Sequence, residues 1–252
     1  MTTDNDSPRA PYAAPWKDAP DGAAANVALA DLVNNLPRRL TVDGVLHAET
    51  LLAATGAIAG FAAQRALMDG MTAEQVVDPS SGFDIVQTTN GGYFFFGEPL
   101  DRALLPQSPA DPHKLWTLAA SGAITGGLDA NALPPIAPMF EFVAKTIGSD
   151  REGTTSVRDC HLRAPARELL MVVWPLALDC FNGQVSGQAL TPPMAVGQRW
   201  RPVIAAHAAN RMIRHTALAV PPLKALTIVM ETAIYASKLP PAMVERQAAL
   251  SA

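Results

Sequence analysis

Cysteine is scarce in this chain of 252 residues, and Cys160 and Cys180 are too few to form a disulfide framework. Charged residues make up only 17% of the sequence and hydrophobic residues 49%, a balance typical of a compact globular protein. The formal net charge of -4 argues against a nucleic-acid partner. The first residues include Asp4 and Asp6, where a signal peptide would have a basic and then an apolar region. We therefore expect a cytoplasmic protein.

The common catalytic and cofactor-binding signatures are also missing. The sequence has no HExxH or CxxC metal motif, no P-loop, no GxSxG and no GxGxxG after a strand. We therefore expect no metal and no cofactor, and whether the protein is an enzyme stays open. The adjacent Cys160 and His161 do not form a nucleophile and its base, because neighbours in an extended loop point apart.

One nine-residue segment of the chain occurs twice. LAATGAIAG at 52–60 returns as LAASGAITG at 118–126, sixty-six residues later. Alanine and leucine favour a helix, whereas each glycine inside one costs about 1 kcal/mol relative to alanine. The spacing gives each helix a flat face, which permits a close helix crossing. We expect the glycines to lie at such crossings, where the two helices either cross each other or each cross a partner: Gly56, Gly60, Gly122 and Gly126.

Both copies are too short to cross a membrane. Glu49 and Arg65 are separated by 15 uncharged residues, and Lys114 and Asp129 by 14. A spanning helix needs about 20 predominantly apolar residues. We interpret both copies as buried helices of a soluble protein without a membrane partner.

Helical patterns cover most of the remaining chain. The sequence predicts an all-α fold in which a flexible tail at 1–22 precedes one compact helical domain of about eight helices at 23–252. The first helix should end before Pro37, and the chain past Pro241 should fray. Asp43 is expected to cap the first glycine helix.

A β-hairpin at 83–97 interrupts the helices. Asn90 and Gly91 separate two strand-like runs, as in a hairpin with a type I′ turn. The second run, YFFF at 93–96, is aromatic on both faces, and an isolated hairpin is unstable. The hairpin must therefore lie on the helices or pair with another subunit. This apolar surface predicts a homodimer, with the hairpin or a glycine helix at the contact.

A basic segment gives the strongest functional signal. No acidic residue occurs between Asp179 and Glu231. On the helix expected at 203–215, the spacing places His207, Arg211 and Arg214 on one face. Such a face can bind an anion through its guanidinium groups. We assign His207 as a catalytic acid–base group and five residues as ligand-binding: Arg199, Asn210, Arg211, Arg214 and His215. Alternatively, the face is solvated and its arginines pair with carboxylates such as Asp150 or Glu152.

The repeat also places His47 and His113 at equivalent positions, near the starts of the two glycine helices. They could converge on one site if the repeats pack with twofold pseudosymmetry. The simpler interpretation is that each histidine is hydrogen-bonded or exposed at its own helix start.

Two classes of function fit these observations. The first is a homodimeric binding or interaction protein. The second is an enzyme that acts on an anionic small molecule through the 203–215 helix. The lack of paired carboxylates and of any catalytic motif favours the first class.

Overall fold

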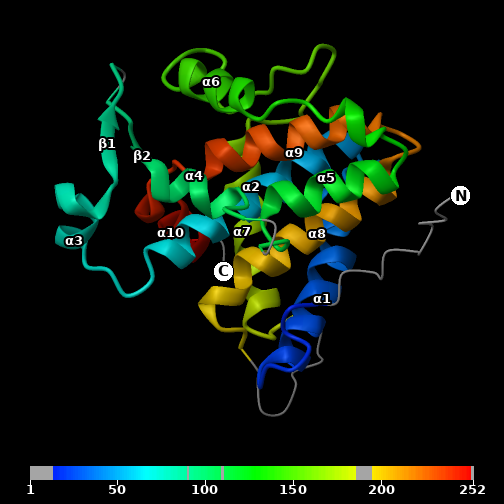
Figure 1. Cartoon of the computed structure of the whole chain (residues 1–252), viewed down its shortest axis with the longest axis horizontal. Coiled ribbons are helices and arrows are strands. Elements are labelled where there is room, and N and C mark those ends of the chain that lie inside the picture. The colour runs from blue at the N-terminus through cyan, green and yellow to red at the C-terminus, as the bar shows by residue number, and fades with distance from the viewer. Residues whose placement is uncertain (1–13, 90, 109–110, 186–194, 251–252) are drawn as a thin grey trace, which may run out of the picture.

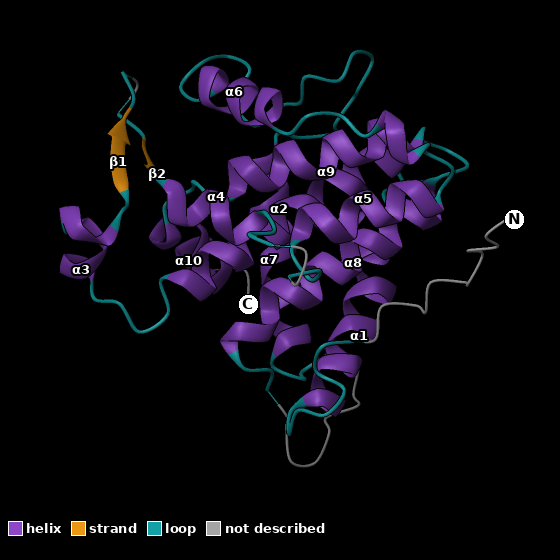
Figure 2. Ribbon diagram, in the orientation of Figure 1, coloured by secondary structure: helices purple, strands orange, loops and turns teal. Residues whose placement is uncertain are grey.

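The computed structural model describes residues 14–89, 91–108, 111–185 and 195–250. Figures 1 and 2 show a helical body with a small hairpin at one side, which confirms the expected fold class. Ten α-helices lie within the described residues: α1 Gly22–Leu40, α2 Ala48–Leu67, α3 Ala73–Val77, α4 Glu98–Leu104, α5 Leu115–Thr125, α6 Ala137–Thr146, α7 Ala166–Phe181, α8 Arg201–Thr216, α9 Pro222–Ala236 and α10 Pro241–Leu250. None of them is long and apolar enough to span a membrane.

Helix α2 lies at the centre of the core, where it crosses α9 most extensively and also contacts α8 and α7. Its residues from Thr50 to Gln64 are all buried. A Cβ atom at Gly56 would lie 2.3 Å from the Val229 carbonyl oxygen, and one at Gly60 only 1.9 Å from that of Ala233. The predicted close crossing at these glycines is therefore confirmed, with α9 as the partner.

Helix α5 crosses a different partner, α8. A Cβ atom at Gly122 would lie 2.8 Å from the Asn210 carbonyl oxygen, so this glycine also permits a close approach of backbones. The prediction is wrong for Gly126. This residue is the C-cap of α5 and only half-buried, and a Cβ atom there would meet the Ala217 methyl group at 3.2 Å. Of the two arrangements left open, the repeat helices each cross their own partner.

The hairpin consists of β1 Asp84–Gln87 and β2 Tyr93–Phe96, and it lies on the chain's own helices. Phe94 and Phe95 point to opposite faces of β2, and both are buried. The Phe95 amide donates a hydrogen bond to the Lys238 carbonyl oxygen at 2.8 Å, just past the end of α9. The aromatic strand is thus covered within the chain.

The hairpin turn differs from the expected type I′ turn. Gly91 N donates to Thr88 O at 3.0 Å, which closes a four-residue turn one position earlier than the sequence suggested. Gly91 has a φ of 84°, as expected for the residue that follows the turn in a three-residue hairpin loop. Asn90 itself lies outside the described residues.

Three expected boundaries are wrong for reasons of packing and capping. Helix α1 continues through Pro37 to Leu40, because Leu36 and Leu40 are buried in the core. The chain past Pro240 forms α10, where Val244 is fully buried. Helix α2 is capped by His47 instead of Asp43, which has a φ of 52° four residues before the cap.

The expected tail at 1–22 lies partly outside the described residues, which begin at residue 14. Trp16 is fully buried, and its indole nitrogen donates to the Asn26 side chain at 2.9 Å. Its ring also contacts Trp200 and His207, with centroid distances of 6.2 and 5.2 Å. The segment that immediately precedes α1 is therefore part of the folded body.

Candidate functional site

Helix α8 carries most of the predicted site residues. Pro202 occupies its first turn, where the missing amide hydrogen costs nothing, and an apolar face packs on α2 and α5. The opposite face carries Arg211 and Arg214, both exposed, and the half-buried His207. The predicted spacing of these three side chains is therefore present on one helix.

A groove of about 770 Å³ lies between α8 and the exposed face of α5. We call it the α5–α8 groove. Four of the six predicted site residues line it together with nine others: Pro106, Trp116, Thr117, Leu118, Ala120, Ser121, Ile124, Thr125, Leu133, His207, Asn210, Arg211 and Arg214. The volume is typical of a small-molecule site.

The two arginines of the groove are not neutralised by the carboxylates expected to pair with them. Glu152 instead lies 3.5 Å from Arg167 and accepts a hydrogen bond from the Tyr235 hydroxyl at 2.8 Å. Within the described part of the chain, neither Arg211 nor Arg214 forms an ion pair. The groove therefore has two guanidinium groups available for an anion.

His207 lies between two aromatic rings at the start of the groove. Its ring centroid is 5.2 Å from that of Trp16 and 5.7 Å from that of His113. The pKa of His207 is lowered to about 4, chiefly by burial and also by the nearby His113 and Arg211. The imidazole is consequently neutral at physiological pH and cannot serve as a proton donor there.

Asn210 holds the two helices together. Its side-chain amide donates to the Leu118 carbonyl oxygen of α5 at 2.8 Å, and its backbone faces Gly122. Asn210 therefore has a positioning role between the helices, and its expected direct contact with a ligand stays a prediction, because the amide has a second hydrogen and the residue lines the groove.

The structure does not bring the remaining two predicted residues into the groove. Arg199 lies in the 3-10 turn Gln198–Trp200, where its guanidinium covers the Trp200 ring at 4.9 Å, and it lines a neighbouring pocket. His215 is exposed in the last turn of α8 and lines neither cavity.

Sequence reasoning missed the α5 side of the groove. Thr117, Ser121 and Thr125 recur every four residues and form a row of hydroxyl groups along the exposed face of α5. Trp116 adds an aromatic wall beside them. The four-residue spacing of these hydroxyl groups is the sequence signal that predicts a polar face on this helix.

The two histidines of the repeat do not converge. His47 caps α2 and hydrogen-bonds with the Thr50 hydroxyl at 2.9 Å, whereas His113 lies beside His207. His113 also lines a pocket with Ala59, which is twelve residues beyond His47 and thus about 18 Å further along α2.

The adjacent Cys160 and His161 are held in a structural loop. The His161 amide donates to the Glu49 carboxylate at 2.8 Å, and the other Glu49 oxygen lies 2.5 Å from the Lys224 ammonium group. Burial raises the pKa of the Cys160 thiol, and the nearby Glu49 carboxylate raises it further. A thiol that stays protonated at neutral pH is a poor nucleophile.

Within the described residues, no group of three His, Cys, Asp or Glu side chains could hold a metal ion. The chain matches no protein-family model, and neither a curated protein nor a solved structure is significantly similar to it. The function is therefore inferred from the geometry of the groove.

Proposed function

We propose that the protein binds an anionic small molecule with an apolar part in the α5–α8 groove. The observation that carries this proposal is the placement of Arg211 and Arg214, without ion-pair partners among the described residues, opposite the hydroxyl row of α5. Guanidinium groups bind phosphate and carboxylate through paired hydrogen bonds. The Thr125 hydroxyl already donates to the Ser121 carbonyl oxygen at 2.8 Å, whereas the hydroxyl groups of Thr117 and Ser121 can donate to the same anion.

The remaining walls of the groove favour a ligand that is only partly polar. Trp116, Ile124 and Leu133 offer apolar surface beside the charged end. Small-molecule sites typically combine such apolar walls with a few polar groups that fix the orientation of the ligand. An aryl phosphate or aryl carboxylate, whose ring can pack on Trp116, therefore fits better than a bare inorganic ion.

The geometry supports binding better than catalysis. His207 is the imidazole of the groove, and its lowered pKa leaves it neutral at physiological pH. A neutral imidazole can accept a proton, but no carboxylate among the lining residues pairs with it as a second acid–base group. That the protein is an enzyme acting on an anionic small molecule is therefore our second hypothesis.

A ligand screen tests the proposal. Thermal unfolding would be followed with inorganic phosphate, phenyl phosphate and benzoate. At equal concentration phenyl phosphate should stabilise the protein most, and a hundredfold excess over its dissociation constant corresponds to about 2.7 kcal/mol. The double variant Arg211→Ala, Arg214→Ala should remove the effect. Arg158→Ala, which removes an exposed arginine of the 149–165 loop, should keep it and is the matched control.

Two outcomes would contradict this proposal. One is the absence of a shift with all three compounds. The other is a shift of equal size in the double arginine variant, which would mean that the anion binds elsewhere. In that case the basic face of α8 is only solvated.

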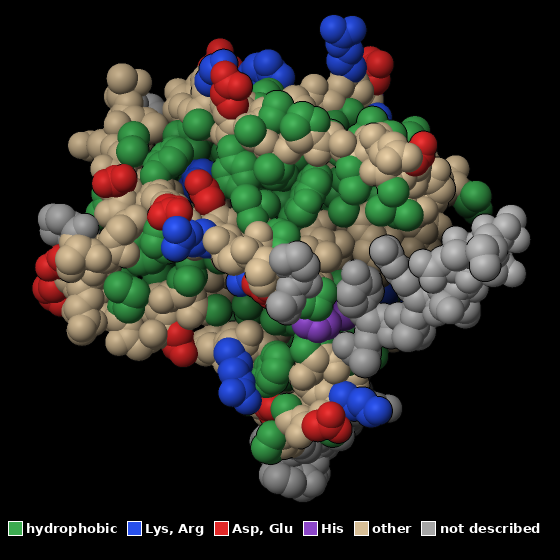
Figure 3. Space-filling model, in the orientation of Figure 1, with side chains coloured by type: hydrophobic (Ala, Val, Ile, Leu, Met, Phe, Trp, Pro, Cys, Tyr) green, Lys and Arg blue, Asp and Glu red, His purple; other side chains and the backbone are tan. Residues whose placement is uncertain are grey.

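The homodimer stays a prediction. Of the surfaces first considered for it, the glycine helix α2 and the Phe94 and Phe95 side chains of β2 are covered by the chain itself. What remains is the outer hairpin surface, where Ile85, Val86 and Tyr93 are each 43% exposed, and the hydrophobic area between α6 and α5 in Figure 3. Light scattering should report twice the chain mass of 26.6 kDa, and a monomer at micromolar concentration would contradict the prediction.

A further inference from the structure

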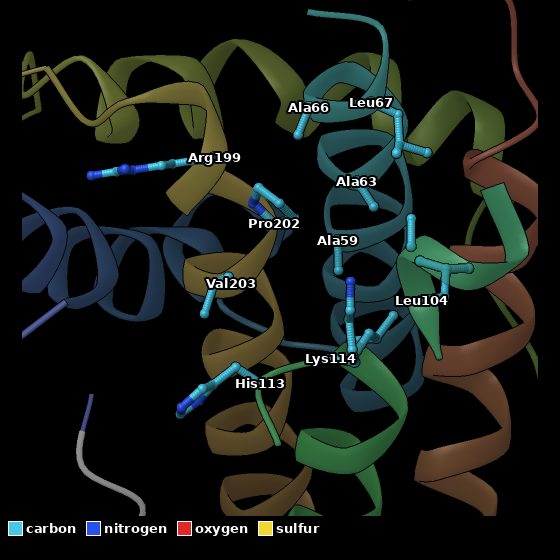
Figure 4. Close-up of a pocket in the computed structure, with 12 residues that line it drawn as sticks. Ala59, Ala63, Ala66, Leu67, Leu104, His113, Lys114, Arg199, Pro202 and Val203 are labelled. Carbon is cyan, nitrogen blue, oxygen red and sulfur yellow. The ribbon is translucent and has the colours of Figure 1, made fainter. Parts of the chain in front are cut away.

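A second, smaller pocket lies between α2, α4 and α8, next to the α5–α8 groove but with different walls. Its volume is about 270 Å³. Ala59, Ala63 and Ala66 form one wall along α2, with Leu104 of α4 and Val203 of α8 on either side of it (Figure 4). We call it the alanine pocket.

The small side chains of α2 explain why this space is open. Ala59, Ala63 and Ala66 recur at helical spacing, so this face of α2 presents only methyl groups. Leu104 and Val203 do not fill the space that remains between the helices. The result is a largely apolar cavity that is partly open to the surface.

Lys114 supplies a positive charge to this apolar pocket. It is the N-cap residue of α5, and its side chain points between α8 and α2, toward Ala59, in Figure 4. Its ion-pair partner within the described residues is Asp111, whose carboxylate lies 3.7 Å from the ammonium nitrogen. This distance is too long for a hydrogen bond, so the ammonium group can still donate to a ligand.

Arg199 also lines the pocket but is turned away from it. In Figure 4 its side chain extends away from the alanine wall, and its guanidinium covers the Trp200 ring at 4.9 Å. Lys114 is therefore the cation that faces the apolar wall. A single ammonium group at one end of an apolar cavity matches a ligand with one negative charge and an aliphatic tail.

We propose that the alanine pocket binds a short straight-chain monocarboxylate, with the carboxylate at Lys114 and the alkyl chain along Ala59 and Ala63. If each non-hydrogen atom occupies about the 30 Å³ of a water molecule, a pocket of 270 Å³ holds about nine such atoms. Hexanoate, with six carbons and two oxygens, fills that space. The site is separate from the α5–α8 groove and does not depend on the function proposed for the groove.

Calorimetric titration of the full-length protein tests this site with butanoate, hexanoate, octanoate and 1-hexanol. Affinity should rise about fourfold for each methylene up to hexanoate, because each one is buried against the pocket wall. It should rise less from hexanoate to octanoate, since further carbons extend through the open side. Hexanol should bind at least about tenfold more weakly, because it lacks the charge that pairs with Lys114.

Two substitutions locate the binding, and the first has a matched control. Lys114→Met keeps the length of the side chain but removes its charge, and it should weaken hexanoate binding about tenfold, whereas Lys114→Arg should retain it. Ala63→Phe should fill the pocket and abolish binding. If Ala63→Phe fails to fold, the two Lys114 variants and the chain-length series still test whether hexanoate binds in this pocket.

The double variant Arg211→Ala, Arg214→Ala separates the two sites. It should leave hexanoate binding unchanged, because neither arginine lines the alanine pocket. Loss of hexanoate binding in this variant would place the carboxylate in the α5–α8 groove and overturn the proposal. It is equally overturned if no monocarboxylate binds, if hexanol binds as tightly as hexanoate, or if Lys114→Met binds hexanoate as the unchanged protein does.

Discussion

The glycine helices α2 and α5 share one sequence motif, but their surroundings in the structure are opposite. Every residue of α2 from Thr50 to Gln64 is buried, whereas α5 buries one face and leaves the other open to the groove. Both cross a partner helix closely at a glycine. The motif therefore determines the close crossing, and other residues determine whether the rest of the helix is covered.

Residues on another face of each glycine helix account for this difference. Where α5 has the hydroxyl row Thr117, Ser121 and Thr125, the equivalent residues of α2 are Leu51, Thr55 and Ala59. The first two of these α2 side chains are packed in the core, and Ala59 forms a wall of the alanine pocket. One copy thus became the centre of the fold, and the second copy became a wall of the candidate site.

The largest expected effect contrasts the two most different glycines of the repeat. Gly60→Ala should destabilise the protein by about 3 kcal/mol or more, because the new Cβ atom would lie 1.9 Å from the Ala233 carbonyl oxygen. Gly126→Ala, at the half-buried end of α5, should change stability by less than about 0.5 kcal/mol. Urea unfolding measures both, and equal losses would show that the two crossings are alike.

The second prediction concerns pH, because the half-buried His207 lies beside the crossing of α5 with α8, whereas α2 and α9 contain no histidine. The pKa of His207 is about 4 in the folded protein and about 6.5 in an unfolded chain. Between these values the unfolded state binds more protons. Stability is therefore lost as the pH falls from about 6.5 to 4, by about 3 kcal/mol from this residue.

A histidine variant separates this contribution from the rest of the acid denaturation. His207→Gln should flatten the loss of stability over that pH range in urea unfolding experiments. His215→Gln, which replaces an exposed histidine of the same helix, should leave the profile unchanged. If both variants keep the profile of the unchanged protein, His207 does not cause the pH dependence.

The contrast between the helices also shows what could be predicted from the sequence. Helical periodicity and the glycine repeat predicted the fold class and the crossings at Gly56, Gly60 and Gly122. The partners could not be predicted, because α8 and α9 carry no complementary glycine motif and their choice depends on packing of the whole core. The end of α1 was wrong because burial of Leu36 and Leu40 outweighs the cost of Pro37 within the helix.

Only the part of the candidate site that lies on a single helix could be predicted from the sequence. The spacing of His207, Arg211 and Arg214 depends on one helix, so the sequence was enough to place them together. The groove and the alanine pocket need residues from several helices, and their walls follow from tertiary contacts. Arg199 lies outside the α5–α8 groove because a 3-10 turn separates it from the helical spacing of α8.

The third prediction compares the residues that face the crossing glycines. Asn210 donates across the interface to Leu118 O, whereas Thr232, opposite Gly56, donates within its own helix to Ile228 O at 2.8 Å. Asn210→Ala should cost about 1 kcal/mol and weaken phenyl phosphate binding, because α5 and α8 lose a hydrogen bond. Thr232→Val should leave phenyl phosphate binding unchanged. Unaltered stability and binding in Asn210→Ala would exclude the positioning role.

The smallest expected effect comes from one pair of equivalent positions, Thr55 of α2 and Ser121 of α5. Thr55 is 1% exposed, and its hydroxyl donates to Leu51 O at 2.7 Å, so Thr55→Ala should cost about 1 kcal/mol without changing ligand binding. Ser121→Ala should change stability by less than about 0.5 kcal/mol, because the side chain lies at the groove surface. It should weaken phenyl phosphate binding about fivefold, the equivalent of one hydrogen bond. Calorimetric titration and urea unfolding of the two variants measure both effects. If Ser121→Ala instead lowers stability and leaves phenyl phosphate binding unchanged, α5 contributes only packing, as α2 does.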